Sequence, residues 1–286
     1  MLGVPWDSSG SGRGETQAPA ALRSAGLAER VDVDLGDAAT VIADTRRDPE
    51  SGVRALADTV AAAGAVARAL GQGRANPDRR ALVIGGDCSL LLGVFAHLRP
   101  ALGDVGLWFV DGHPDYADAT ASETGETADL ELAALTGAGP PALVGLGGVV
   151  PMVHARHVAL IGHRTTDLEP AAAAELARVP ADVTTIDAAS VICDPRAAAD
   201  RAVAWAGRLR LPMWLHVDVD VLDPADMPAV TYPQNGGLNL DQLAVLLAPL
   251  TASTNLVGVS VADLRPDLDP DGHHAARLVH LLDRVL

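Results

Sequence analysis

The stretch Asp218-Val219-Asp220-Val221-Leu222-Asp223-Pro224 follows an apolar run over residues 213–217 and decides how the rest of the chain is interpreted. Acids placed directly after an apolar run are typical of a buried strand that ends at a polar site. The carboxyl ends of parallel strands meet at one edge of a sheet, where ligands usually bind. Two further stretches repeat the arrangement: Gly85-Gly86-Asp87-Cys88-Ser89 after residues 81–84, and Asp111-Gly112-His113-Pro114-Asp115 after residues 105–110. The three stretches therefore predict one shared polar site.

These strand ends carry the residue types that bind metal ions. Residues two apart in an extended segment share a face, so Asp111, His113 and Asp115 point one way if the strand geometry continues. The same spacing joins Asp218 and Asp220. Acids gathered in one pocket repel one another unless cations hold them. Two divalent ions bridged by shared carboxylates are the interpretation that we favour, while helix capping and turn formation by the aspartates remain the alternative.

Strand-like and helix-like segments alternate along the chain. The expected strands cover residues 31–35, 81–84, 105–110, 157–161, 183–186, 213–220 and 256–261, and the expected helices cover residues 53–70, 90–98, 171–177, 196–208, 241–250 and 274–286. This alternation predicts a three-layer α/β/α fold with a mainly parallel sheet. The 286 residues contain no low-complexity linker, so we expect a single domain over residues 1–286.

Composition narrows the class of protein. The formal net charge is −16 and every basic residue apart from histidine is arginine, which argues against nucleic acid or an anionic membrane as a partner. Two cysteines make no disulfide framework. The chain does not open on a basic segment followed by an apolar one, and no apolar run approaches the length of a membrane span, so we expect a soluble cytoplasmic protein.

The three strand-end stretches, in this order, resemble the signature motifs of the arginase/agmatinase (ureohydrolase) family. The likeness extends over nearly the whole chain. The further stretches that resemble the family are Gly3-Val4-Pro5-Trp6-Asp7, Ala18-Pro19-Ala20-Ala21-Leu22-Arg23, Ile161-Gly162-His163-Arg164, Met227-Pro228-Ala229 and Gly236-Gly237-Leu238. The resemblance implies an arginase-like α/β hydrolase with a binuclear manganese centre that cleaves guanidino or related amidino groups. It also implies a homo-oligomer, a trimer or hexamer.

The resemblance assigns roles to the candidate ligands. Asp111 and Asp218 would bridge the two metal ions, Asp115 would hold one ion, and Asp220 and His113 would hold the other. Such a pair polarises a bridging water into hydroxide near neutral pH. The hydroxide would attack the planar guanidino or amidino carbon, and the tetrahedral intermediate would expel an amine. Asp115 is also the predicted catalytic residue.

For two residues near this centre the sequence allows two interpretations each. Cys88 stands where most of the family has a histidine ligand. A thiolate can bind a divalent ion but favours Zn²⁺, Fe²⁺ or Co²⁺ over Mn²⁺, and a buried thiol that binds nothing is the alternative. His216 alternates with Asp218 and points the same way, either as support for the ligands or as a buried histidine with its hydrogen bonds satisfied.

The residues expected to contact substrate depart from the family pattern. Ala128 falls where arginases have a histidine used in proton transfer, and a methyl group cannot carry a proton. Asp263 falls where the family usually has a longer glutamate facing the guanidinium. Asp167 matches an acid that contacts the α-amino group in arginases, and Thr124 lies in the long polar loop 114–129 that would face the substrate.

The sequence therefore predicts a metal-dependent amidinohydrolase whose small guanidino or amidino substrate is not simply arginine. A modified guanidine, formimino or hydroxyguanidine compound is one alternative substrate. A catalytically silent homologue with a binding or structural role is a second interpretation, and a deacetylase-like hydrolase with one zinc ion fits less well. The acidic surface is compatible with a cationic substrate, although net acidity can also serve solubility alone.

Overall fold

The computed structural model describes residues 1–73 and 79–286, and these residues form one seven-stranded sheet. The strands are β1 Leu2–Val4, β2 Ala81–Gly85, β3 Gly106–Val110, β4 Val158–Ile161, β5 Thr184–Ile186, β6 Met213–Asp218 and β7 Leu256–Ala262. They lie in the order β1-β2-β7-β6-β3-β4-β5, and every neighbouring pair is parallel. The predicted parallel sheet is confirmed.

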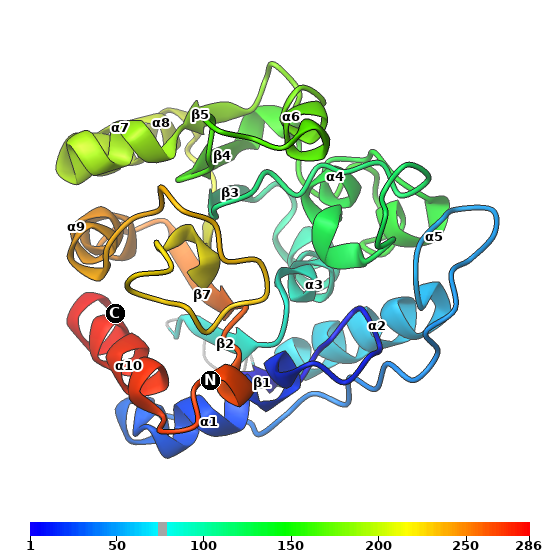
Figure 1. The fold of residues 1–286 in the computed structure, drawn as a ribbon, viewed down its shortest axis with the longest axis horizontal. Helices are drawn as coiled ribbons and strands as arrows, with labels where there is room; N and C mark the ends of the chain where they lie inside the picture. Colours follow the sequence, from blue (N-terminus) through cyan, green and yellow to red (C-terminus); the bar gives the residue numbers. More distant parts are fainter. Residues whose placement is uncertain (74–78) are drawn as a thin grey trace.

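Helices cover both faces of this sheet, which confirms the three layers (Figure 1). One face carries α1 Ala18–Ser24, α7 Ala188–Cys193, α8 Pro195–Leu209, α9 Leu240–Thr251 and α10 His273–Val285. The other carries α2 Leu56–Gly73, α3 Leu91–Leu102, α4 Glu131–Leu135 and α5 Pro141–Val144, while α6 Pro170–Leu176 buries none of its residues. The 3₁₀ helices are η1 Gly14–Gln17, η2 Leu27–Arg30, η3 Cys88–Leu90, η4 Thr127–Asp129, η5 Ala155–His157, η6 Val219–Val221 and η7 Pro266–Leu268.

The central strands are apolar throughout because both of their faces are buried. All five residues of β3 are buried. Its Trp108 packs in the core under α8, and the indole N–H donates to the carbonyl oxygen of Ala202 in that helix at 3.2 Å. Phe109, one residue further on, packs in the core on the opposite face. The described helices include none that is long and apolar enough to cross a bilayer.

One expected strand is wrong. Residues 31–35 form no strand, and Val33 and Leu35 are 41% and 45% exposed. The segment runs beside β1 with few backbone contacts, among them the Leu35 N–H to the carbonyl oxygen of Met1 at 2.9 Å. Too little apolar surface is buried there to hold a ladder. The other expected strands and helices each overlap an observed element.

Candidate metal centre

The carboxyl ends of four adjacent strands lie together at one edge of the sheet. β2, β7, β6 and β3 are neighbours in the sheet. Cys88 lies in the 3₁₀ turn after β2, Asp111 directly follows β3, Asp218 is the last residue of β6, and Asp263 directly follows β7. All four side chains belong to residues no more than 6% exposed. Segments far apart in the sequence therefore meet because parallel strands end at the same edge.

Asp111 and Asp218 lie in the middle of this group. The ligand atoms of Asp111, His216 and Asp218 lie within 4.8 Å of one another. One oxygen of Asp111 accepts the N–H of His113 at 2.7 Å, and one oxygen of Asp218 accepts the N–H of Asp220 at 2.8 Å. The aspartates thus do form turns, as the alternative interpretation expects. The second oxygen of Asp111 is buried without a hydrogen-bond partner among the described residues, which leaves it available to an ion.

One side of the centre carries its own positive charge. His113 Nδ1 lies 2.8 Å from an oxygen of Asp220, whose other oxygen accepts the Gly112 N–H at 3.2 Å. Burial opposes ionisation of Asp220, but His113 and then Arg164 hold its pKa below the ordinary value. Burial alone would lower the pKa of His113, and Asp220 raises it overall. A Cβ atom at Gly112 would come within 1.7 Å of the Arg164 guanidinium, so a larger residue here would displace that side chain.

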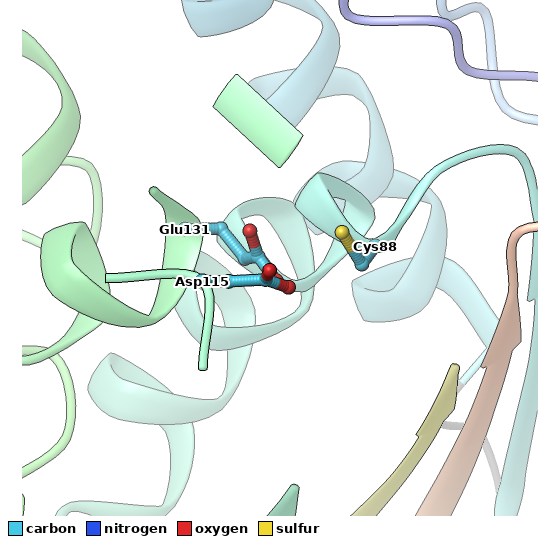
Figure 2. A group of neighbouring side chains, drawn as sticks. All are labelled: Cys88, Asp115 and Glu131. Atoms are coloured by element: carbon cyan, nitrogen blue, oxygen red, sulfur yellow. The ribbon is translucent and has the colours of Figure 1, made fainter. Parts of the chain in front are cut away.

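The opposite side of the centre contains two carboxyl groups and a thiol, and no basic side chain of the described residues is paired with them. The ligand atoms of Cys88, Asp115 and Glu131 lie within 4.8 Å of one another, and all three residues are buried (Figure 2). The thiol of Cys88 donates to the carbonyl oxygen of Ala128 at 3.3 Å. Sequence reasoning missed Glu131, which is the first residue of α4. Its only signal is an acid set among apolar residues, with leucine on each side and Ala133 to Leu135 beyond.

The electrostatics of the centre favour a bound cation. Burial, reinforced by neighbouring carboxylates, raises the pKa values of Asp111, Asp115, Asp218 and Asp263 well above the ordinary value. Burial likewise raises the pKa of the Cys88 thiol. Carboxylates, an imidazole and a thiol are ligands of divalent metal ions. The residues present therefore fit such ions, and a cation would relieve the repulsion among the acids.

His216 is a further member of the centre. Its Nδ1 lies 2.8 Å from the hydroxyl of Ser260, which also accepts the indole N–H of Trp214 at 2.9 Å. Its Nε2 is buried without a hydrogen-bond partner among the described residues and faces the group formed with Asp111 and Asp218. Burial lowers the pKa of His216 to about 3, so the ring is neutral. One ring nitrogen of His216 is thus hydrogen-bonded and the other is not. The first fits a buried histidine with its hydrogen bonds satisfied, and the second fits support for the ligands.

The three residues expected to contact substrate lie in different surroundings. Asp263 groups with Asp218 and Asp220, and one of its oxygens accepts the Thr231 N–H at 3.1 Å. The hydroxyl of Thr124 donates to the side chain of Asp129 within the same loop. Asp167 is exposed in the loop after β4 and belongs to none of the ligand groups found among residues 1–73 and 79–286. The structure therefore brings Asp263 into the centre and leaves Asp167 outside it.

Three of these aspartates have a left-handed backbone. The φ angles are +45° at Asp115, +55° at Asp167 and +69° at Asp263. Aspartate tolerates this region better than most residues, yet the conformation costs of order 1 kcal/mol or more. At Asp115 the extended geometry of the preceding strand has ended, so its side chain need not share the direction of Asp111 and His113. Backbone strain of this kind gathers at functional sites.

A chain of contacts connects Arg13 from the chain's first segment and Glu126 from the long loop, through Tyr232, to His113. Arg13 forms a bidentate ion pair with Glu126, with distances of 2.6 and 2.8 Å. The Arg13 guanidinium lies 6.0 Å from the centre of the Tyr232 ring. The Tyr232 ring in turn lies 6.5 Å from the ring of His113. Tyr232 is 41% exposed, so this group links the buried centre to solvent.

Glu15 is another buried acid that sequence reasoning missed. It is 1% exposed, one of its oxygens accepts the hydroxyl of Thr231, and the other has no partner among the described residues. Its ligand atoms lie within 4.8 Å of those of Asp7 and Asp87. Burial, followed by the charge of Asp87, raises the pKa of Glu15 to about 8. Glu15 also contributes to the raised pKa of Asp263, which places its charge near the centre.

Comparison with known proteins agrees with this arrangement. The sequence model of the Arginase family matches residues 1–285. The arginase of Bacillus caldovelox is 29% identical over 291 residues, which cover 99% of this chain and 95% of that protein. The arginase of Brevibacillus brevis is 28% identical over 291 residues, which cover all of this chain and 96% of that protein.

A solved structure shows the same fold. The native structure of the Bacillus caldovelox arginase superposes with a TM-score of 0.85 and 28% identity, over 99% of this chain and 96% of that one. Both the match of the family model over nearly the whole sequence and the likeness of the folds support the resemblance carried by the strand-end motifs. The chain belongs to the Arginase family.

Proposed function

We propose that the protein is a metal-dependent amidinohydrolase that hydrolyses a C–N bond of a guanidino or related linear amidine compound. One observation carries the proposal. Buried acids from four adjacent strand ends face one another with too few positive partners, and one oxygen of Asp111 has no partner among the described residues. Such an arrangement is costly unless divalent cations bind there. Membership of the Arginase family points to the same chemistry.

The side chains divide between two ions. Asp111 and Asp218, which lie centrally, would contact both ions. Cys88 and Asp115 would hold one ion, and His113 and Asp220 would hold the other. When bound, the ions supply the Lewis acidity that activates a water molecule for attack on the amidine carbon. We propose manganese as the metal, with zinc, iron or cobalt as alternatives because of the Cys88 thiolate.

The chain's own residues bind the substrate and hold its protons. Asp263 and Glu15 place carboxyl groups beside the centre, and a planar cationic group bound there would favour their ionised forms. Asp115, which lies in the same centre, would accept the proton that the attacking water loses. Thr124 and Asp167 remain predicted contacts for the far end of the substrate.

Ala128 determines which substrates react well. It carries no group that could protonate a leaving amine, a step typically worth about 10²–10⁴-fold. We therefore expect slow hydrolysis of L-arginine and agmatine and faster hydrolysis of a compound whose leaving group needs less help, such as a formimino or hydroxyguanidine compound. The same residue favours the second candidate, a silent homologue that binds a ligand without turning it over.

Other features complete the proposal. We propose a cytoplasmic homo-oligomer, a trimer or hexamer, built from a single domain over residues 1–286. The net charge of −16 supports the absence of nucleic acid and anionic membrane among its partners.

Two measurements on the protein purified without chelator test the function. Elemental analysis should find about two divalent ions per chain. A screen for urea and amine release over guanidino, formimino and hydroxyguanidine compounds should find turnover that disappears when a chelator removes the metal. Metal at the centre without turnover of any of these compounds would favour the silent homologue, and the lack of bound metal after incubation with manganese, zinc, iron and cobalt would overturn the proposal.

A further inference from the structure

We propose that Glu131 is a metal ligand that joins Cys88 and Asp115 around one ion of the centre. The inference rests on the proposed function and deepens it, because it adds a ligand that the strand-end motifs do not contain. Cys88 stands in a signature motif, whereas Glu131 comes from a short helix behind the long polar loop. Glu131 would thus add a carboxylate ligand on the side of the centre where Cys88 supplies a thiol.

The surroundings of the Glu131 carboxylate carry the argument. The residue is 0% exposed, and its carboxylate finds no hydrogen-bond partner among the described residues outside the group that it forms with Asp115 and Cys88. Figure 2 shows the carboxylates of Asp115 and Glu131 side by side, with Cys88 beside them. A buried carboxyl group without a partner is rare and costs several kcal/mol when it is charged. A group of three acids that leaves such a carboxylate unpaired is what a bound cation would balance.

Backbone contacts hold the three residues in this arrangement. The N–H of Ala133, in the first turn of α4, donates to the carbonyl oxygen of Asp115 at 3.2 Å. The thiol of Cys88 donates to the carbonyl oxygen of Ala128, three residues before Glu131, at 3.3 Å. Leu132 and Leu135 anchor the helix in the core. The acids are therefore not brought together by the flexibility of their own side chains, and their positions are set before any ion binds.

No positively charged side chain among the described residues forms an ion pair with Asp115 or Glu131. None of the ion pairs found among residues 1–73 and 79–286 includes Asp115 or Glu131. On the other side of the centre, Asp220 is paired with His113 at 2.8 Å. A protonated acid pair is the competing explanation for Asp115 and Glu131. A shared proton would join only the two carboxyl groups, whereas a bound ion would also be held by Cys88.

The set of ligand atoms indicates which ions fit. A thiolate alone would favour soft ions such as zinc, whereas carboxylate oxygens suit harder ions such as manganese. Glu131 adds an oxygen and a negative charge beside the Cys88 sulfur. It would therefore keep this position able to hold Mn²⁺, Fe²⁺ or Co²⁺ as well as Zn²⁺, and its loss should shift the preference toward zinc.

Substitution of Glu131 tests the assignment, with metal binding as the readout. Glu131→Gln keeps the shape and removes the charge, and Glu131→Asp keeps the charge at shorter reach. Glu175→Gln is the control, because Glu175 is a half-buried acid that accepts the N–H of Tyr116, the residue after Asp115, at 2.8 Å and belongs to none of the ligand groups. Each chain is loaded with Co²⁺ or Mn²⁺, and the affinity of each ion is measured by competition with a chelator. The absorption of the cobalt protein, including its sulfur-to-metal band, is recorded in parallel.

We expect Glu131→Gln to weaken the binding of one of the two ions by about tenfold or more and to shift the cobalt absorption. Glu175→Gln removes a nearby charge but no ligand, so it should change the affinity much less and leave the cobalt absorption unchanged. Glu131→Asp should retain the ion with an altered spectrum, which keeps the test valid should the glutamine variant fold poorly. Unchanged affinity and spectrum in both Glu131 variants would overturn the inference while the wild-type protein still binds two ions. Loss of turnover with both ions retained would overturn it too, in favour of proton transfer. A wild-type protein that binds no ion would overturn the proposed function itself.

Discussion

Two sides of the same buried centre differ in how their charge is balanced. Cys88, Asp115 and Glu131 form a group of acids that no cationic side chain joins among the described residues. His113 and Asp220 form a close pair, with Arg164 near enough to help hold the pKa of Asp220 low. On the second side a cationic partner offsets the charge of Asp220, whereas the first side has no such partner among the described residues. We therefore expect the two sides to respond in opposite ways when an acid is removed.

The largest effect should come from the residues shared by both sides. Asp111→Asn or Asp218→Asn removes a bridging carboxylate, so both ions should be lost and turnover should fall by about 10³-fold or more. Elemental analysis and the rate of substrate hydrolysis check this. If either variant keeps full metal occupancy, that residue does not bridge the ions.

The opposite responses appear most clearly in the metal-free protein. Asp220→Asn breaks the pair with His113 beside the buried Arg164, and we expect a loss of about 3 kcal/mol in the free energy of unfolding. Asp115→Asn removes one of several repelling acids, so it should raise the free energy of unfolding, by about 1 kcal/mol. Urea unfolding in the presence of a chelator measures both values. Changes of the same sign in the two variants would contradict the difference between the sides.

Substitution of Cys88 tests the difference between the two sides of the centre in a second way. Cys88→His should raise the affinity for manganese relative to zinc, on the order of tenfold, because imidazole is a harder ligand than thiolate. Cys88→Ser should weaken the binding of only one ion, the one held by Cys88, Asp115 and Glu131. Metal titrations of the two variants test this, and unchanged affinity in both would place the thiol outside the ligand set.

The last prediction concerns the pH dependence of stability and the buried acid next to the centre. Burial raises the pKa of Glu15 from 4.5 to about 8, so the folded state binds a proton that the unfolded state releases. The stability that Glu15 contributes is therefore full below pH 4.5 and is lost as the pH rises toward 8. In Glu15→Gln, the unfolding free energy of the metal-free protein should fall less over this window. Parallel pH profiles of the two proteins would show that Glu15 titrates normally.

The sequence predicts which polar residues after the apolar strands lie together. Cys88, Asp111 and Asp218 do meet at one edge of the sheet, because the ends of parallel strands fix their place, while their role as ligands stays a prediction. Glu131 and Glu15 were missed because they come from a short helix and from the polar first segment of the chain, where no local pattern points inward. Helix and loop residues reach the centre only through packing against the sheet, which no short-range periodicity records.

The sequence by itself determined the parallel α/β architecture and the strand-end acids, because hydrophobic periodicity and the residues that follow it are local properties. Only the tertiary structure decided which acids lie together. Asp115 leaves the strand direction through a left-handed backbone and joins Cys88 and Glu131 instead of His113. Its partners come from β2 and α4, and the contacts between these elements depend on how the whole sheet packs. A balance of buried charges is a property of that packing, because it depends on distances between segments far apart in the chain.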